Sequence, residues 1–124
     1  KPTRDFTFVE DTAISFVKAI NKKKSYGQVI NVGNSFDISI NDIVKIFKND
    51  FGYKFKVLLE SKRERPDKSE VMRLFASNRK ARQILNWKPS YEGIKGFKKG
   101  LLKTIEWFKS EENKQSYNIK DYII

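Results

Sequence analysis

Apolar side chains recur at helical spacing in two long segments of this 124-residue chain. In residues 11–20, and again in residues 92–109, they stand three and four positions apart. This spacing places them on one face of a helix, so both segments are predicted to form amphipathic helices. Gly93, Gly96 and Gly100 lie within the second helix at the same spacing, which indicates close packing against another element.

Two shorter helices are indicated by capping signals. Ser39 begins a Ser-x-x-Asp pattern with Asp42 ahead of an apolar run, which predicts a helix that ends near Gly52. Ser77 is expected to cap a third helix over residues 78–85, and the Trp-Lys-Pro sequence that follows should end it.

Three further segments have the patterns of short β-strands. Residues 4–9 and 54–59 alternate polar and apolar side chains, and residues 28–32 form a β-rich run closed by a Gly-Asn turn. Residues 60–70 are charged, contain a proline and lack periodicity, so they are predicted to be a loop. Because strands and helices alternate, we expect the α/β class, as one small mixed domain of about four helices with short strands.

The length of the chain suits a single domain with its own core. We assign residues 1–109 to that domain and residues 110–124 to a polar C-terminal tail. The only methionine in the sequence is Met72, so we interpret the chain as a processed product or a fragment of a longer protein, and we favour the fragment.

Composition excludes several kinds of site. The chain has no cysteine and no histidine, which removes disulfides, thiolate metal sites and histidine-based catalytic triads. No apolar run is long enough to span a bilayer, so we expect a soluble, cytoplasmic protein without a membrane partner. The net charge of +11 comes from 26 basic and 15 acidic residues, but 20 of the basic residues are lysines scattered along the chain. We interpret most of them as a solvated surface.

Four segments together resemble one protein family. They are RDFTFVEDT at residues 4–12, VINVGNSFDISINDI at 29–43, RERPDKSEVMRLFASNRKARQILNW at 63–87 and TIEWF at 104–108. Their order and spacing are similar to those of extended short-chain dehydrogenases that act on nucleotide sugars. The resemblance covers residues 1–109 and is nearest to bacterial NAD-dependent 4,6-dehydratases, with the 4-epimerase and decarboxylase branches close by. Ser77 and Arg79 depart from the family pattern, which often has Asp and Ser at these positions.

The resemblance implies that the chain is the C-terminal, substrate-binding domain of such an enzyme. The Rossmann domain that binds NAD would lie outside this chain, together with the catalytic Tyr-x-x-x-Lys pair. This chain alone is then expected to be inactive, with no catalytic, cofactor-binding or metal-binding residue. The parent enzyme would be a homodimer that acts on a nucleotide-diphosphate sugar in the biosynthesis of cell-surface sugars.

The resemblance also implies four substrate-binding residues. Arg4 and Arg65 match family arginines that point at the diphosphate, and a planar guanidinium suits phosphate oxygens. Asn31 matches a position near the phosphates, and Glu70 matches one near the ribose hydroxyls. Simpler interpretations stay open: ion pairs with neighbouring acids for the arginines, a turn position for Asn31 and a solvated carboxylate for Glu70. Arg63 is a weaker candidate in the same loop.

A Tyr-x-x-x-Lys match does occur in this chain, at Tyr91 and Lys95. With 20 lysines in the sequence, such a match is expected by chance. It also lies where the family has no catalytic residue. We therefore interpret it as a coincidence.

Two other interpretations belong to different functional classes. A small basic nucleic-acid-binding module would account for the charge and for aromatic residues such as Tyr26 and Tyr53. However, no predicted helix gathers Lys and Arg on one face, so nucleic acid is not the partner we expect. A free-standing protein that assembles with a separately encoded Rossmann partner is the other alternative. For the fragment, we expect weak nucleotide affinity, no turnover and exposure of apolar surface that normally faces the nucleotide-binding half.

Overall fold

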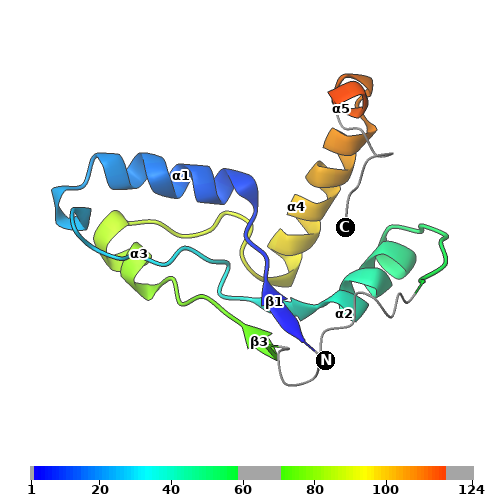
Figure 1. Ribbon diagram of the computed structural model, residues 1–124, viewed down its shortest axis with the longest axis horizontal. Coiled ribbons are helices and arrows are strands. Elements are labelled where there is room, and N and C mark those ends of the chain that lie inside the picture. The colour runs from blue at the N-terminus through cyan, green and yellow to red at the C-terminus, as the bar shows by residue number, and fades with distance from the viewer. Residues whose placement is uncertain (1, 59–70, 117–124) are drawn as a thin grey trace.

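The structure is a computed structural model that describes residues 2–58 and 71–116. In chain order its elements are β1 (Thr3–Asp5), α1 (Val9–Ile20), the 3₁₀ helix η1 (Lys23–Ser25), β2 (Asp37–Ser39), α2 (Ile40–Lys45), the π-helical segment η2 (Ile46–Asp50), β3 (Arg73–Leu74), α3 (Arg79–Leu85), α4 (Gly93–Lys109) and α5 (Glu111–Ser116). Helices and short strands alternate along the chain, which confirms the expected small mixed α/β fold (Figure 1). Helix α5 is an addition, because the sequence pattern predicted no helix in residues 110–124.

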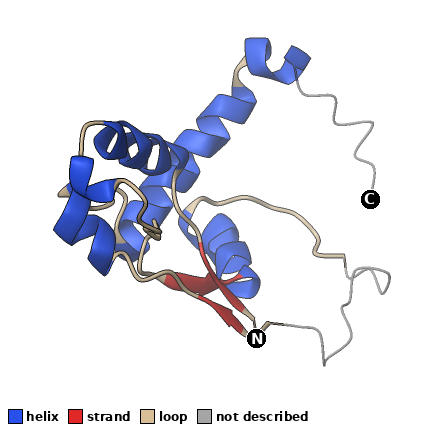
Figure 2. Ribbon diagram, turned by 60° about the vertical axis from the view of Figure 1, so that its left-hand side comes forward, coloured by secondary structure: helices blue, strands red, loops and turns tan. Residues whose placement is uncertain are grey.

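A three-stranded sheet in the order β2-β1-β3 joins distant parts of the chain (Figure 2). β1 pairs antiparallel with β2 and parallel with β3. Asp37 on β2 connects all three strands, because Thr3 Oγ1 donates to it at 2.6 Å and the Arg73 guanidinium donates two hydrogen bonds of 2.8 and 3.0 Å. The hydrogen bonds from Arg73, and then from Thr3, hold the pKa of Asp37 at about 2. The side chains thus reinforce a sheet whose strands are very short.

Helix α1 begins and ends close to the predicted bounds, but its apolar face points outward. The side chains of Asp11 and Ser15 are buried, whereas Phe16 and Ile20 are 68% and 70% exposed. The inner face packs against α3, with Ala19 beside the buried Ala81 and Leu85. Amphipathic spacing therefore located the helix correctly without indicating which face is buried.

The predicted helix after Ser39 is confirmed together with its cap. Ser39 Oγ accepts a hydrogen bond from Asp42 N at 3.2 Å and donates one to Asp42 Oδ2 at 2.6 Å. This reciprocal pair satisfies backbone and side-chain groups at the start of α2. The helix continues into the π-helical η2 and ends at Asp50, just before Gly52, which has a positive φ of 70°.

Helices α3 and α4 also match their predicted ranges, with one correction at a cap. Asn78, rather than Ser77, occupies the N-cap position of α3, and Ser77 is exposed. Asn78 is buried, and its side-chain amide donates to the Gly33 carbonyl at 3.2 Å. The side chain at the start of α3 therefore fastens this helix to a distant loop.

Two of the predicted strands are wrong, and a third is shorter than predicted. Residues 28–32 and 54–58 form no strand in the structure, and Leu59 lies outside the described residues. The strand predicted at residues 4–9 is limited to β1, after which the chain turns into α1. A strand requires a hydrogen-bonding partner, and alternation of side chains does not supply one. Alternation did predict burial in part, since Ile30 and Val32 pack against the buried α3 cluster.

Two small apolar clusters form the core. One contains Ile38, Ile46 and Phe97, and the other contains Ala81, Leu85 and Trp87. The described part of the chain contains no helix that is both long enough and apolar enough to cross a membrane.

Two of the three glycines of α4 are packed closely, as their spacing predicted, whereas a Cβ atom added at Gly93 would meet nothing within 4 Å. A Cβ atom added at Gly96 would lie 2.0 Å from the carbonyl carbon of Tyr91, and one added at Gly100 would lie 3.0 Å from the Phe8 ring. The absence of a Cβ lets the segment that follows β1 and the segment before α4 approach the helix backbone. The partner elements are therefore within this chain.

Candidate functional site

Asp5 holds together three segments where β1 ends. Its carboxylate accepts hydrogen bonds from the backbone N–H groups of Asn34 at 2.8 Å, Ser35 at 3.0 Å and Ala76 at 3.3 Å. The three donors come from the loop before β2 and from the segment before α3. Gly33 is necessary here, since a Cβ at this position would lie 2.4 Å from Ala76 Cβ. The Arg-Asp and Asn-x-Gly segments of the sequence thus meet around the Asp5 carboxylate.

Arg4 precedes Asp5 on β1, and its side chain reaches the segment before β3. Its Nη1 donates to the carbonyl oxygens of Thr3 and Val71, both at 2.8 Å. Because β3 pairs parallel with β1, Val71 and Met72 lie beside the start of β1, and Thr3 N donates to Met72 O at 2.9 Å. The guanidinium of Arg4 is therefore next to Val71, the first described residue after position 70.

The other predicted binding residues are not all within the described residues. Arg65 and Glu70 lie outside them, as does the weaker candidate Arg63. Asn31 is exposed in the loop before β2, three residues ahead of Asn34. Their roles in substrate binding stay predictions.

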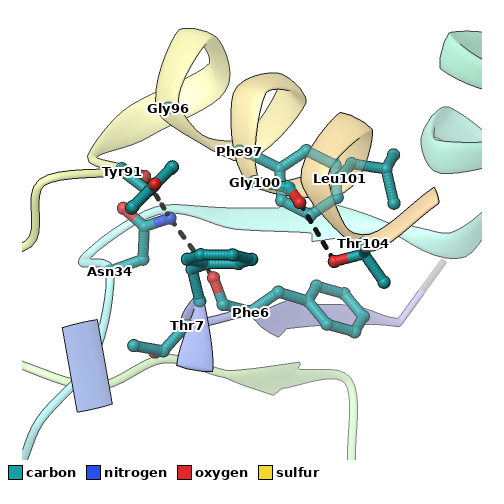
Figure 3. Close-up of a pocket in the computed structure, with 10 residues that line it drawn as sticks. Phe6, Thr7, Asn34, Tyr91, Gly96, Phe97, Gly100, Leu101 and Thr104 are labelled. Atoms are coloured by element: carbon teal, nitrogen blue, oxygen red, sulfur yellow. Dashed lines mark hydrogen bonds between the residues drawn. The ribbon is translucent and has the colours of Figure 1, made fainter. Parts of the chain in front are cut away.

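Asn34, for which the sequence pattern predicts only a turn, connects the residue that follows β1 to the segment before α4 (Figure 3). It is 2% exposed, and its amide nitrogen donates to the carbonyl oxygens of Phe6 at 3.2 Å and Tyr91 at 3.1 Å. Its Oδ1 accepts from Gly93 N at 2.9 Å, where α4 begins. Every polar atom of this buried side chain has a partner. A polar residue directly after an Asn-x-Gly turn is the sequence signal that could have indicated this role.

A small cavity lies beside Asn34, between the segment that follows β1 and α4. Its volume is about 180 Å³, and its walls are mainly aromatic and glycine positions: Phe6, Phe8, Tyr91, Gly96, Phe97 and Gly100. Ligand sites for drug-sized molecules usually measure about 300–1,000 Å³. This cavity is thus too small for a nucleotide sugar and too apolar for a diphosphate.

Asp11 provides a second link through a buried carboxylate, here between α1 and the segment before α4. The side chain is 1% exposed and accepts hydrogen bonds from Ser90 N at 2.7 Å and Tyr91 N at 3.0 Å. Trp87, equally buried, donates through its indole N–H to the Asp11 carbonyl at 3.0 Å. The sequence indicated Asp11 only as a helix-start residue, because its partners are distant in sequence.

Tyr91 belongs to a polar cluster on the surface of α4. Its hydroxyl donates to Glu10 Oε2 at 2.8 Å, and Lys103 Nζ donates to the same carboxylate at 3.0 and 3.2 Å. Hydrogen bonds from Lys103 and then Tyr91 lower the pKa of Glu10, and the contacts with Tyr91 and Glu10 raise the pKa of Lys103. The Tyr91 hydroxyl is thus engaged with Glu10.

An open groove of about 660 Å³ adjoins this cluster. Its lining residues are Thr7, Phe8, Val9, Glu10, Lys103, Thr104, Glu106 and Trp107. With two carboxylates against one lysine, the groove is not suited to a diphosphate. Across residues 2–58 and 71–116, no group of three or more acidic side chains is arranged to hold a metal ion.

Comparison with known proteins relates this arrangement to a family. A sequence profile of the family described as GDP-mannose 4,6 dehydratase matches residues 1–100. A putative UDP-glucose 4-epimerase of Methanocaldococcus jannaschii is 30% identical over 87% of this chain and 32% of its own length. A UDP-glucuronate 4-epimerase of Thermodesulfobacterium geofontis is 34% identical over 89% of this chain and 31% of its own length.

A solved structure shares the fold. It is an epimerase from Methanothermobacter thermautotrophicus, which superposes with a TM-score of 0.75 at 29% identity. The superposition covers 92% of this chain and 31% of the epimerase. This chain therefore spans about a third of the length of the relatives that it matches.

Proposed function

Since the chain belongs to the GDP-mannose 4,6 dehydratase family of nucleotide-sugar-modifying short-chain dehydrogenases, we propose that it is the part of such an enzyme that binds the nucleotide diphosphate of the sugar substrate. NAD and the catalytic residues belong, in this proposal, to an N-terminal Rossmann domain outside these 124 residues. The chain alone binds nucleotides weakly and does not turn over substrate.

The position of Arg4 is the observation that carries the proposal. Its guanidinium lies 2.8 Å from the Val71 carbonyl, directly after the segment that contains Arg65 and Glu70. In the proposed site, Arg4 and Arg65 bind the phosphate oxygens through charge-assisted, bidentate hydrogen bonds. Asn31 and Glu70 complete the proposed set, near the phosphates and the ribose respectively.

A titration of the 124-residue chain with UDP, GDP and dTDP by calorimetry tests the nucleotide site. We expect Arg65→Ala or Arg4→Ala to weaken binding of the preferred nucleotide by about tenfold or more, because a hydrogen bond to a charged group contributes about 1.5–3 kcal/mol. Arg79→Ala is the matched control, since Arg79 is exposed on α3 and its loss removes the same charge. The nucleotide affinity of Arg79→Ala should stay within about twofold of that of the unsubstituted 124-residue chain.

Three outcomes would contradict the proposal: no binding of any of the three nucleotides, equal losses in all three variants, or salt-dependent binding of DNA in place of nucleotides. The last outcome would favour the basic nucleic-acid-binding module. Melting curves for each variant show whether a lost affinity reflects unfolding.

The reaction of the parent enzyme is proposed to be 4,6-dehydration, following the description of the matching family. A 4-epimerase is the second candidate, because relatives that match most of this chain carry that name. Mass spectrometry of the product formed by the complete protein distinguishes the two. Dehydration removes one water from the nucleotide sugar, whereas epimerisation leaves the mass unchanged.

A further inference from the structure

A basic hollow lies between α1 and the segment that connects α3 to α4. Its volume is about 390 Å³. Figure 1 shows α1 and α3 side by side on one side of β1, with α2 on the other side. The wall of the hollow contains three cations, two polar side chains and an apolar side chain: Lys18, Arg82, Lys88, Asn86, Ser90 and Ile14. No acidic residue lines it, and we call this feature the α1–α3 hollow.

Hydrogen bonds hold two of the three cations in place. Lys18 Nζ donates to the Asn86 carbonyl at 2.9 Å. Arg82 Nε donates to Asn78 Oδ1 at 2.9 Å, and the same guanidinium forms an ion pair with Glu92. A side chain that is already ordered loses less conformational entropy when it binds a ligand. The α1–α3 hollow is therefore preorganised for an anion.

The positive charge of this hollow is only partly neutralised. Glu92 pairs with Arg82, whereas neither Lys18 nor Lys88 has an acidic partner in the part of the chain that the structure describes. The carboxylate of Asp11 is bound by two backbone N–H groups, is 1% exposed and does not line the hollow. Two lysine charges thus remain for a ligand, in contrast to the groove at α4 with its two carboxylates and one lysine.

Neutral donors stand beside the lysines. Asn86 has a left-handed backbone, with φ of 50° and ψ of 42°, and asparagine adopts this conformation more readily than most residues other than glycine. Its side-chain amide and the Ser90 hydroxyl both line the hollow, and each can donate a hydrogen bond. The buried Trp87 forms part of the same wall and is fixed by its bond to the Asp11 carbonyl.

The C-terminus of α3 offers a simpler explanation for one of the cations. Helix C-termini attract positive charge, and the carbonyl that Lys18 contacts belongs to the C-cap residue Asn86. This attraction does not account for Lys88, which lies beyond the cap and is exposed. It also does not account for an open volume next to the three cations.

We propose that the α1–α3 hollow binds the phosphate group of a small molecule, either free phosphate or a phosphate ester. A phosphate group carries about 1.5 to 2 negative charges at neutral pH, which matches the charges of Lys18 and Lys88. Its oxygens accept charge-assisted hydrogen bonds from these lysines and further bonds from Asn86 and Ser90. The volume is within the usual range for small-molecule sites, about 300–1,000 Å³, and Ile14 offers an apolar contact to an ester.

This inference goes beyond the proposed function, since none of the residues that line the hollow belongs to the proposed nucleotide site. It therefore stands or fails independently of that site.

Nuclear magnetic resonance of the ¹⁵N-labelled 124-residue chain tests the proposal. Inorganic phosphate and phenyl phosphate are titrated separately, with sodium chloride adjusted to keep the ionic strength constant. The chain has two tryptophans, so the Trp87 indole signal reports on the hollow and the Trp107 indole signal serves as an internal control. We expect the Trp87 indole and the backbone amides of Lys88 and Ser90 to shift until they saturate, while the Trp107 indole stays unchanged.

Three charge-removing variants locate the binding. Lys18→Gln and Lys88→Gln should each weaken phosphate binding by about fivefold or more, because each removes a charge-assisted hydrogen bond. Lys54→Gln is the matched control, since Lys54 is exposed in the segment after η2, and its affinity should stay within about twofold. Lys88→Gln removes no hydrogen bond within the described residues, so it keeps the test valid if Lys18→Gln disturbs the fold.

The two ligands distinguish the sources of the phosphate group. Tighter binding of phenyl phosphate would assign the hollow to a phosphate ester, and equal affinities would assign it to free phosphate. Shifts that do not saturate, or equal losses of affinity in all three variants, would overturn the proposal. A DNA oligonucleotide that shifts the same signals and is not displaced by phosphate would assign the hollow to nucleic acid and would also overturn it.

Discussion

Replacing Asp11 with alanine tests whether a buried carboxylate joins α1 to the segment before α4. The substitution keeps the helix backbone and its bond with the Trp87 indole, but it removes the acceptor for two N–H groups. It also removes polar atoms from a position that is 1% exposed. The effect on stability should therefore come from the lost acceptors.

The expected loss can be worked out donor by donor. The N–H of the buried Tyr91 cannot readily find a substitute, and a hydrogen bond to a charged group contributes about 1.5–3 kcal/mol. Ser90 is exposed, so water replaces part of its bond and the cost falls toward the lower end of that range. The sum is about 3–4.5 kcal/mol, which is a large part of the usual stability of a domain, about 5–15 kcal/mol.

Urea denaturation followed by circular dichroism and tryptophan fluorescence measures this loss. With a urea dependence of about 1.5–2 kcal/mol per molar, the midpoint should fall by about 2 M. Asp50→Ala is the control, because Asp50 forms an exposed pair with Lys98 and its loss should cost about 0–1 kcal/mol. If the free energy of unfolding of Asp11→Ala were within about 1 kcal/mol of that of Asp50→Ala, the role of the Asp11 carboxylate in linking the two segments would be refuted.

Two further predictions concern α4 and the sheet. Gly96→Ala should destabilise the protein by about 1–3 kcal/mol in the same urea assay, although alanine normally favours a helix, because its Cβ would lie 2.0 Å from the Tyr91 carbonyl carbon. Gly100→Ala, facing a ring at 3.0 Å, should be milder, and a stabilising Gly96→Ala would contradict the packing. The lowered pKa of Asp37, about 2, means that its stabilisation is present above pH 4 and is lost as the pH falls toward 2. Asp37→Asn should therefore flatten the pH dependence of stability in that range relative to Asp50→Asn, and an unchanged slope would argue against the Arg73 pair.

The candidate site was predicted only in part, and the reason is physical. The resemblance indicated Arg4, and the structure brings it beside Val71 through the pairing of β1 with β3. The resemblance also singled out the segments that contain Asp5, Asp11 and Asn34, but their structural roles became clear only from their partners. Those partners lie up to 80 residues away, and hydrogen bonds over such separations leave no periodic trace in the sequence.

The sequence by itself determined where α1 to α4 lie, although it did not indicate α5. Apolar spacing, capping residues and helix-breaking residues are signals that act within a few positions of the chain. The ranges of α1, α3 and α4 and the cap at Ser39 could therefore be predicted directly from the sequence. Strands were less predictable, since residues 28–32 have the alternation of a strand but form none.

Only the tertiary structure decided which face of α1 is buried. Periodicity showed that the helix has an apolar side, and the usual expectation is that this side faces the core. The buried acceptors of Asp11, matched to donors near Tyr91 and Trp87, instead direct the polar side inward and leave Phe16 exposed. Burial depends on which groups meet across the fold, and that information lies in contacts between distant segments.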